Sequence, residues 1–327
     1  MRKIGLAVLA TLLLATLAPA AFAAGKPLVV VLAKGMLKEN IQLKWMMGNI
    51  TEVEWKVVTE TLTYDDLKGA KMLIIVFVDS AQKLSASEID AIKKWLAEGG
   101  KTLWVCGDSD YKAGDYRRID AANQVLEAIG SCLRFEHREA VDRKSNCGKP
   151  YRVAAIIEPD KAVAFLKEGV TKPVLFHGPG LLIAYKDGKW YKLEKKVPKG
   201  VYRIAWTSEA GAISEFVKGK PEIHDIGEEG RFVLMAAEVL GKNLIIASAE
   251  APFDHYRGMW TTEYHGVALD GPTFVKNVVL WGVGLKGKIP GGFPAIYVAI
   301  AIVVIVVIAI ALIFVKRGKA KAEAESK

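Results

Sequence analysis

The stretch from residue 295 to residue 315 constrains this chain most strongly, because its 21 residues carry no charged side chain. The hydrocarbon core of a bilayer, about 30 Å thick, requires about 20 such residues to be crossed by a helix. Basic residues follow directly from Lys316 onward, and basic residues beside a span stay on the cytoplasmic side. We therefore expect one C-terminal transmembrane helix at 295–315, with membrane lipid as its partner, and a cytoplasmic basic tail at 316–327.

The first 23 residues have the pattern of an export signal. Arg2 and Lys3 precede a short apolar run, and Ala21-Phe22-Ala23 has the small-x-small pattern of a cleavage site. The alternative is an uncleaved N-terminal anchor, which Pro19 disfavours because it breaks a helix. The sequence therefore predicts a single-pass protein of the cell membrane whose body lies outside the cytoplasm.

The region between these ends, residues 24–285, is long enough for one large domain, and a Gly/Pro-rich linker at 286–294 follows it. Of the net charge of +9, the signal contributes +2 and the tail +3, which leaves +4 for the body. Nucleic-acid binding calls for a concentrated basic stripe, so no nucleic-acid partner is expected.

The chain has 34 Lys and 11 Arg but only 6 Asn and 3 Gln, a bias typical of proteins from thermophiles.

Continuous apolar runs predict strands that are buried on both faces. They cover Leu28–Leu32, Met72–Val78 and Thr102–Cys106, and an alternating segment at 53–57 predicts a further strand. Helical patterns separate several of these runs. Such alternation predicts an α/β fold with a flavodoxin-like, mostly parallel sheet and helices on both faces.

Local signals mark the ends of helices and the position of an inserted β region. Ser85 and Glu88 form a capping box, and Gly99-Gly100 ends the helix that follows. Between about 150 and 215 the pattern changes, and Asp187-Gly188 separates two alternating runs. Asp-Gly at this place predicts a β hairpin turn, so we expect β hairpins inserted into the α/β domain.

The chain has three cysteines, Cys106, Cys132 and Cys147. Outside the cell, an odd number favours one disulfide and one free thiol. Cys132 and Cys147 are the closest pair, and their bridge would stabilise the fold by roughly 3 kcal/mol in the chain-entropy account; the other two pairings remain open. No Cys/His spacing of a zinc site is present, so neither a metal nor a cofactor is expected.

Cys106 ends a predicted buried strand and is followed by Gly107. In open α/β sheets, ligands bind beyond the carboxyl ends of the strands, and a thiol there can act as a nucleophile. Further matching stretches run through the body, at residues 84–88, 99–103, 125–130, 172–174, 241–248 and 274–281. In this order they resemble the class I glutamine amidotransferase-like fold. The resemblance is closer to its divergent, usually non-catalytic branch, which includes the intraflagellar-transport and gliding-motility ABC-accessory domains.

The amidotransferase enzymes of this fold have a glycine before the nucleophile and a compact His-x-Glu near the end. Here Val105 precedes Cys106, and His255 has no Glu two residues later, while Glu250 lies five residues before it. A Cys106/His255/Glu250 catalytic triad is one interpretation. The other, which we favour, is that Cys106 packs as a small buried hydrophobe.

Two loops could bind a ligand. The first gathers an acid, two rings, a His and an Arg within a few residues, as expected for the rim of a site for an acidic or sugar-like ligand: Asp254, His255, Tyr256, Arg257 and Trp260. The second loop contains His177 before a Gly-Pro-Gly turn, although a buried His bonded to its neighbours is the commoner case. His137 and His224 lie in polar stretches and are expected to face solvent.

From the resemblance we expect a non-catalytic, membrane-anchored, extracytoplasmic binding or assembly component, accessory to a membrane complex such as an ABC-type transporter. Fold-level resemblance does not by itself define function. One alternative is an extracytoplasmic thiol hydrolase or amidase using Cys106 with His255. The other is a structural envelope protein.

Overall fold

The computed structural model describes residues 25–107, 116–214, 219–254 and 257–290. The described residues up to Lys288 belong to one compact unit. No helix among the described residues has the length and apolar character needed to cross a bilayer. The predicted export signal at 1–23, the predicted span at 295–315 and the basic tail lie outside the described residues.

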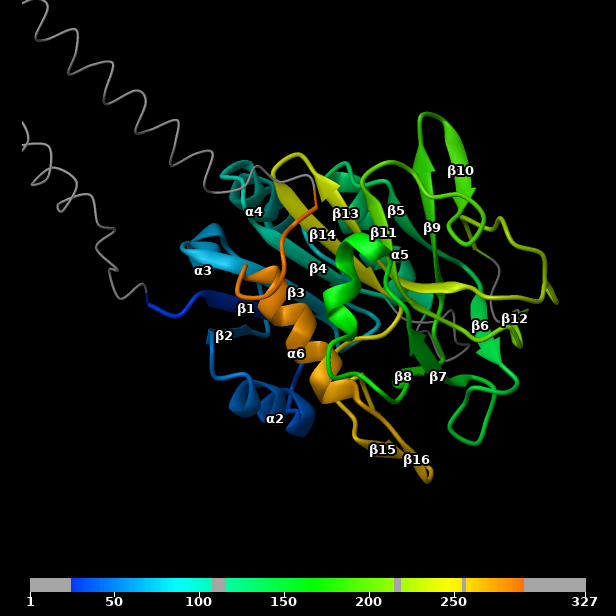
Figure 1. Cartoon of the computed structure of the whole chain (residues 1–327). Coiled ribbons are helices and arrows are strands. Elements are labelled where there is room, and N and C mark those ends of the chain that lie inside the picture. Colours follow the sequence, from blue (N-terminus) through cyan, green and yellow to red (C-terminus); the bar gives the residue numbers. More distant parts are fainter. Residues whose placement is uncertain (1–24, 108–115, 215–218, 255–256, 291–327) are drawn as a thin grey trace, which may run out of the picture. The chain divides into compact units, whose positions relative to one another are not determined.

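A nine-stranded sheet forms the centre of the body (Figure 1). Its first five strands pair in parallel, and its last four continue the sheet through antiparallel pairings. The strands in spatial order are β2 (Glu54–Val58), β1 (Leu28–Lys34), β3 (Ala70–Phe77), β4 (Thr102–Cys106), β14 (Asn243–Ser248), β13 (Val233–Leu240), β11 (Val201–Trp206), β7 (Arg152–Ile157) and β8 (Val174–His177). The expected α/β class with a large central sheet is confirmed.

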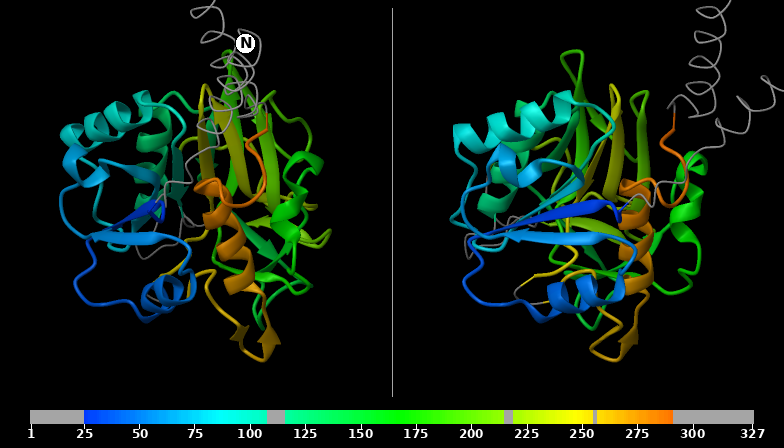
Figure 2. Two further views of the ribbon diagram at one scale, coloured as in Figure 1. Left: turned by 60° about the vertical axis from the view of Figure 1, so that its left-hand side comes forward. Right: turned by 90° about the vertical axis from the view of Figure 1, so that its left-hand side faces the viewer.

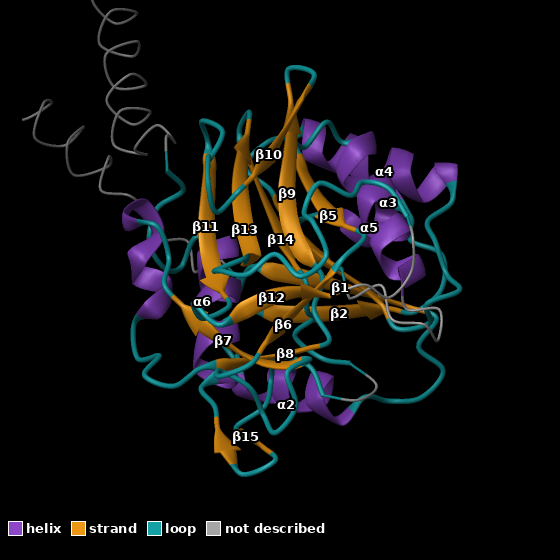
Figure 3. Ribbon diagram, turned by 90° about the vertical axis from the view of Figure 1, so that its right-hand side faces the viewer, coloured by secondary structure: helices purple, strands orange, loops and turns teal. Residues whose placement is uncertain are grey.

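Helices cover both faces of the parallel half (Figures 2 and 3). Successive strand residues point to opposite faces, so Leu73 packs in the core cluster under one set of helices, whereas Met72 lies against Gly282 of the last helix. The helices are α2 (Ile41–Asn49), α3 (Tyr64–Leu67), α4 (Ala86–Ala97), α5 (Tyr116–Ala128), the 3₁₀ helix η1 (Lys161–Lys167) and α6 (Gly271–Gly282).

Local chemistry explains where α3 and α4 begin. Ser85 accepts the backbone N–H of Glu88, and the Glu88 carboxylate accepts the Ser85 backbone N–H at 2.8 Å, which completes the predicted capping box. Thr63 and Asp66 form a second capping box at α3. Glu88 is also buried and pairs with Lys34 of β1 at 2.7 Å, so the start of α4 is joined to the sheet.

Three smaller sheets surround the antiparallel half. They consist of β10 (Lys189–Lys192), β9 (Leu181–Lys186) and β5 (Leu133–Glu136); of β12 (Gly211–Ser214) and β6 (Glu139–Asp142); and of β15 (Glu263–Tyr264) and β16 (Val267–Ala268). The predicted hairpin turn between β9 and β10 is confirmed, since Asp187 and Gly188 both have positive φ, at 51° and 74°. Such a turn matches the twist of the flanking strands.

Candidate functional site

The carboxyl ends of β4 and β14 place Cys106 beside Ser248. The two residues are register partners in the parallel pair, and the Gly107 backbone N–H donates to the Ser248 carbonyl at 2.8 Å. The Ser248 hydroxyl accepts the Trp104 indole N–H at 2.7 Å and donates to the Glu250 carbonyl at 2.6 Å. Cys106, the residue expected as a possible nucleophile, thus lies next to hydrogen bonds that join β4 to β14.

The Cys106 thiol is buried, and burial raises its pKa far above the ordinary value. A hydrogen bond with Ser248 lowers the pKa, but this effect is smaller, and the nearby charge of Glu250 raises it further. A reactive cysteine needs the opposite surroundings: an accessible thiolate in a positive environment. These surroundings disfavour the thiolate at neutral pH.

Glu250 lies at the same sheet edge and is 3 % exposed. Its two carboxylate oxygens accept backbone N–H groups, one from Ala251 and one from His177, each at 2.7 Å. The structure thus brings together three residues singled out in the sequence, Cys106, Glu250 and His177. The third member of the suggested triad, His255, lies outside the described residues, as does Tyr256.

The His177 ring packs edge to face against two tyrosine rings. Its ring centroid lies 5.7 Å from that of Tyr151 and 5.9 Å from that of Tyr264, both edge to face. Arg152 stacks over both tyrosine rings. His177 therefore forms part of an aromatic and cationic cluster at the end of β8.

The loop after β14 is held by Gln42 of α2, a residue that the sequence analysis missed. The Gln42 side chain donates to the Trp260 carbonyl at 2.7 Å and accepts the Gly258 N–H at 2.9 Å. Trp260 is buried, Asp254 is half-buried, and Arg257 is exposed. A lone Gln in a short helix gives no sequence signal for a contact more than 200 residues away.

The predicted Cys132–Cys147 disulfide is not formed, since all three cysteines are free and buried. Cys132 packs in the main core cluster, whereas Cys147 packs in a separate cluster with Leu175 and Leu269. Burial raises the pKa of the Cys132 thiol to about 12 and that of the Cys147 thiol to about 11. Closeness in sequence was misleading, because the two residues pack in different hydrophobic clusters.

An open cleft of about 820 Å³ lies beside the β9–β10 hairpin. Tyr185 and Trp190 are register partners on the hairpin, their ring centroids lie 4.6 Å apart, and both side chains are more than 40 % exposed. Charged and amide side chains complete the wall: Asp120, Asn123, Gln124, Glu127, Arg134, Lys220 and Glu222. The sequence shows the alternating pattern of the two hairpin strands. It does not show which face of the hairpin remains exposed to solvent.

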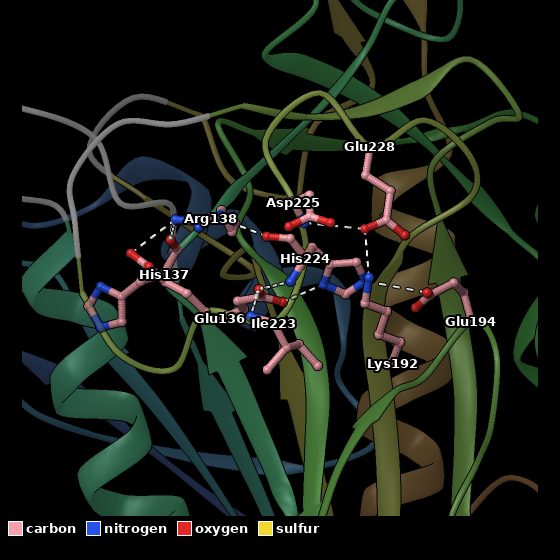
Figure 4. Close-up of polar contacts among 10 residues, drawn as sticks. Glu136, His137, Arg138, Lys192, Glu194, Ile223, His224, Asp225 and Glu228 are labelled. Carbon is pink, nitrogen blue, oxygen red and sulfur yellow. Dashed lines mark hydrogen bonds and ion pairs between the residues drawn. The ribbon is translucent and has the colours of Figure 1, made fainter.

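A cluster of polar side chains surrounds His224 (Figure 4). The His224 Nδ1 lies 2.5 Å from the Glu136 carboxylate, and its Nε2 lies 3.3 Å from Glu194. Burial lowers the pKa of the ring, but the hydrogen bonds with these two carboxylates outweigh burial and raise it to about 9. His224 and His137 are both buried, so the expectation that they face solvent is wrong. Glu136, in β5, accepts the backbone N–H of His224, which lies 88 residues later in the chain.

Comparisons with known proteins yield similarities of structure alone. No protein-family model matches the chain, and no curated protein matches it. Among solved structures, the mmIFT52 N-terminal domain is 13 % identical over 78 % of this chain and 96 % of its own, with a TM-score of 0.47. A putative GMP synthase component from Thermoplasma acidophilum is 9 % identical over 80 % of this chain and 94 % of its own, with a TM-score of 0.39.

A third solved structure, of the carbohydrate deacetylase Agd3, is 7 % identical over 68 % of this chain and 29 % of its own, with a TM-score of 0.34. At these values the likenesses extend no further than the general arrangement of the fold. No activity, ligand or branch of the amidotransferase-like fold follows from them.

Proposed function

We propose that this chain is a non-catalytic binding component, whose body is held outside the cytoplasm by the C-terminal helix and binds one component of a larger membrane complex. One observation carries the non-catalytic part of the proposal: the buried Cys106 thiol, whose pKa is raised. Nucleophilic catalysis by cysteine needs an accessible thiol whose pKa is lowered by its neighbours. Cys106 has the opposite surroundings, and the Glu250 carboxylate beside it accepts backbone amides.

The cleft beside the β9–β10 hairpin supports the binding part. Exposed tyrosine and tryptophan side chains are typical centres of protein interfaces, since they bury a large area at little cost in conformational entropy. Tyr185 and Trp190 form such a pair, and the charged residues around them would form a polar rim. We therefore assign the partner surface to this cleft.

The partner class rests on the resemblance and on the predicted topology. A body tethered beside the bilayer by a short linker meets other membrane proteins at a high effective concentration. The resemblance to transporter-accessory domains makes a multi-span permease the partner we propose. This step is an analogy at the level of fold.

Affinity purification of the full chain from gently solubilised membranes tests the proposal. A multi-span permease should co-purify with the wild type and should be lost or strongly reduced with Trp190→Ala. Trp45→Ala is the matched control, because Trp45 is a half-exposed tryptophan on α2. If no permease co-purifies, or if both variants lose it equally, the proposed partner surface is wrong.

A further inference from the structure

We propose that Glu194, His224 and Glu228 bind one divalent transition-metal ion, with Zn²⁺ as the first candidate. One oxygen or nitrogen atom of each side chain lies within 4.8 Å of the others. Imidazole nitrogen and carboxylate oxygen are the ligands that such ions take in proteins. The imidazole favours a transition metal over Ca²⁺ or Mg²⁺, which prefer oxygen ligands alone.

An unsatisfied carboxylate oxygen points independently to a missing partner. The Glu194 side chain is 7 % exposed, and its Oε1 lies 3.3 Å from His224 Nε2. Its other oxygen, Oε2, is buried and has no hydrogen-bond partner among the described residues. Leaving a buried charged oxygen without a partner is costly, and a bound cation would remove that cost.

The His224 ring is already oriented as a metal ligand. Its Nδ1 faces the Glu136 carboxylate at 2.5 Å, and the same carboxylate accepts the backbone N–H groups of Ile223 and His224. Glu136 is therefore fixed, and an Nδ1–H donated to it leaves the Nε2 lone pair directed toward Glu194 and Glu228 (Figure 4). A metal-bound histidine almost always donates its other ring N–H to such a partner.

The charges around the ring also favour a divalent cation. Glu136, Glu194 and Glu228 supply three negative charges, and Lys192 pairs with Glu228 at 2.6 Å. With a neutral imidazole, a dication and Lys192 would together balance the three carboxylates. A network that is neutral as a whole costs far less to bury than one with an excess charge.

The cluster is partly exposed to solvent on the side of Glu228. The Glu228 and Lys192 side chains keep 22 % and 28 % of their surface exposed, whereas the ring of His224 is fully enclosed. Lys192 therefore competes with the metal for Glu228. Its removal should strengthen metal binding, whereas removal of a metal ligand should weaken it.

The test uses the untagged full chain in detergent, stripped with a chelator and then titrated with Zn²⁺ alone. Calorimetry and metal analysis should give one ion per chain. Glu194→Gln and Glu228→Gln should each weaken binding on the order of 100-fold, and Glu136→Gln should weaken it about 10- to 100-fold. The matched control is Glu229→Gln, because Glu229 is the exposed neighbour of Glu228 and pairs with Arg143 outside the cluster.

Two further measurements test whether Zn²⁺ binds at this cluster. Lys192→Met should bind Zn²⁺ more tightly than the wild type, and Co²⁺ should acquire a visible absorption spectrum that Glu228→Gln abolishes. Because Glu228 is partly exposed, its variant should fold even where a change at His224 does not; thermal unfolding of each stripped variant checks this. The proposal would be overturned if Zn²⁺ did not bind, or if Glu194→Gln and Glu228→Gln did not weaken its binding. The cluster would then be an internal ion-pair network without a metal.

Discussion

The carboxylate of Glu250 accepts the backbone N–H of His177 at 2.7 Å, across 73 residues of chain. This bond joins the loop after β14, in the parallel half of the sheet, to the end of β8, at the edge of the antiparallel half. It also lies beside Cys106, whose pKa the Glu250 charge helps to raise. The Glu250 carboxylate therefore links two segments that are far apart in the sequence.

Glu250→Gln should destabilise the fold by about 1–3 kcal/mol, because the amide keeps one acceptor oxygen and turns a donor toward a backbone N–H. Urea unfolding monitored by circular dichroism would measure the loss. The exposed Glu263→Gln serves as the control and should change stability by less than about 0.5 kcal/mol. Equal stability of both variants would contradict the structural role of Glu250.

The native chain should resist thiol alkylation at neutral pH. All three cysteines are buried, and burial raises the pKa of each thiol, so the reactive thiolate is scarce. Mass spectrometry after a short exposure to iodoacetamide should find little label at Cys106, and full labelling at all three sites after unfolding. Rapid labelling of native Cys106 would instead support the thiol-hydrolase alternative.

Gly107→Ala should destabilise the fold by about 1–3 kcal/mol through overpacking. A Cβ at this position would lie 2.7–2.9 Å from ring atoms of Phe135, which is fully buried. Replacing the ring with Phe135→Leu should make the Gly107→Ala change less costly, which a double-mutant cycle measures.

Gly48→Ala is the control for this substitution, since the residue lies in α2 and a Cβ there meets no atom of the described residues within 4 Å. This variant should be neutral or more stable by up to about 1 kcal/mol. A similar loss in both variants would show that the Phe135 contact is not the cause.

The stabilising effect of Asp66 should disappear in acid. Its pKa is lowered to about 2, first by the hydrogen bond from Lys56 and then by the one from Thr63. A carboxyl group whose folded pKa lies below the unfolded value of 3.8 stabilises the fold above about pH 4 and ceases to do so as the pH falls through 2.

Asp66→Asn should therefore cost about 1 kcal/mol at pH 7, a typical value for a capping interaction. The difference from the wild type should shrink between pH 4 and pH 2, as measured by urea unfolding at each pH. Asp90→Asn, at an exposed position of α4, should show no such trend. A constant difference for Asp66→Asn down to pH 2 would contradict the assigned cause.

Local patterns determined much of the parallel half and the turn of one hairpin outside it. The apolar runs at β1, β3 and β4, the capping box of Ser85 and Glu88, and the Asp187-Gly188 turn each act within a few residues, so the sequence alone predicts them. The same patterns did not predict the antiparallel extension of the sheet through β13, β11, β7 and β8. Which strand pairs with which depends on distant segments, and periodicity carries no information on that choice.

Only the tertiary structure decided what the polar and sulfur side chains do. The strand pattern placed Cys106 at a sheet edge, but only the complete fold showed that its thiol is buried and that burial raises its pKa. His224 was expected in solvent because its own segment is polar, yet Glu136 lies 88 residues earlier in the chain and holds it in the interior. Burial, pKa and ligand geometry depend on all neighbours in space, and the sequence specifies those only through the complete fold.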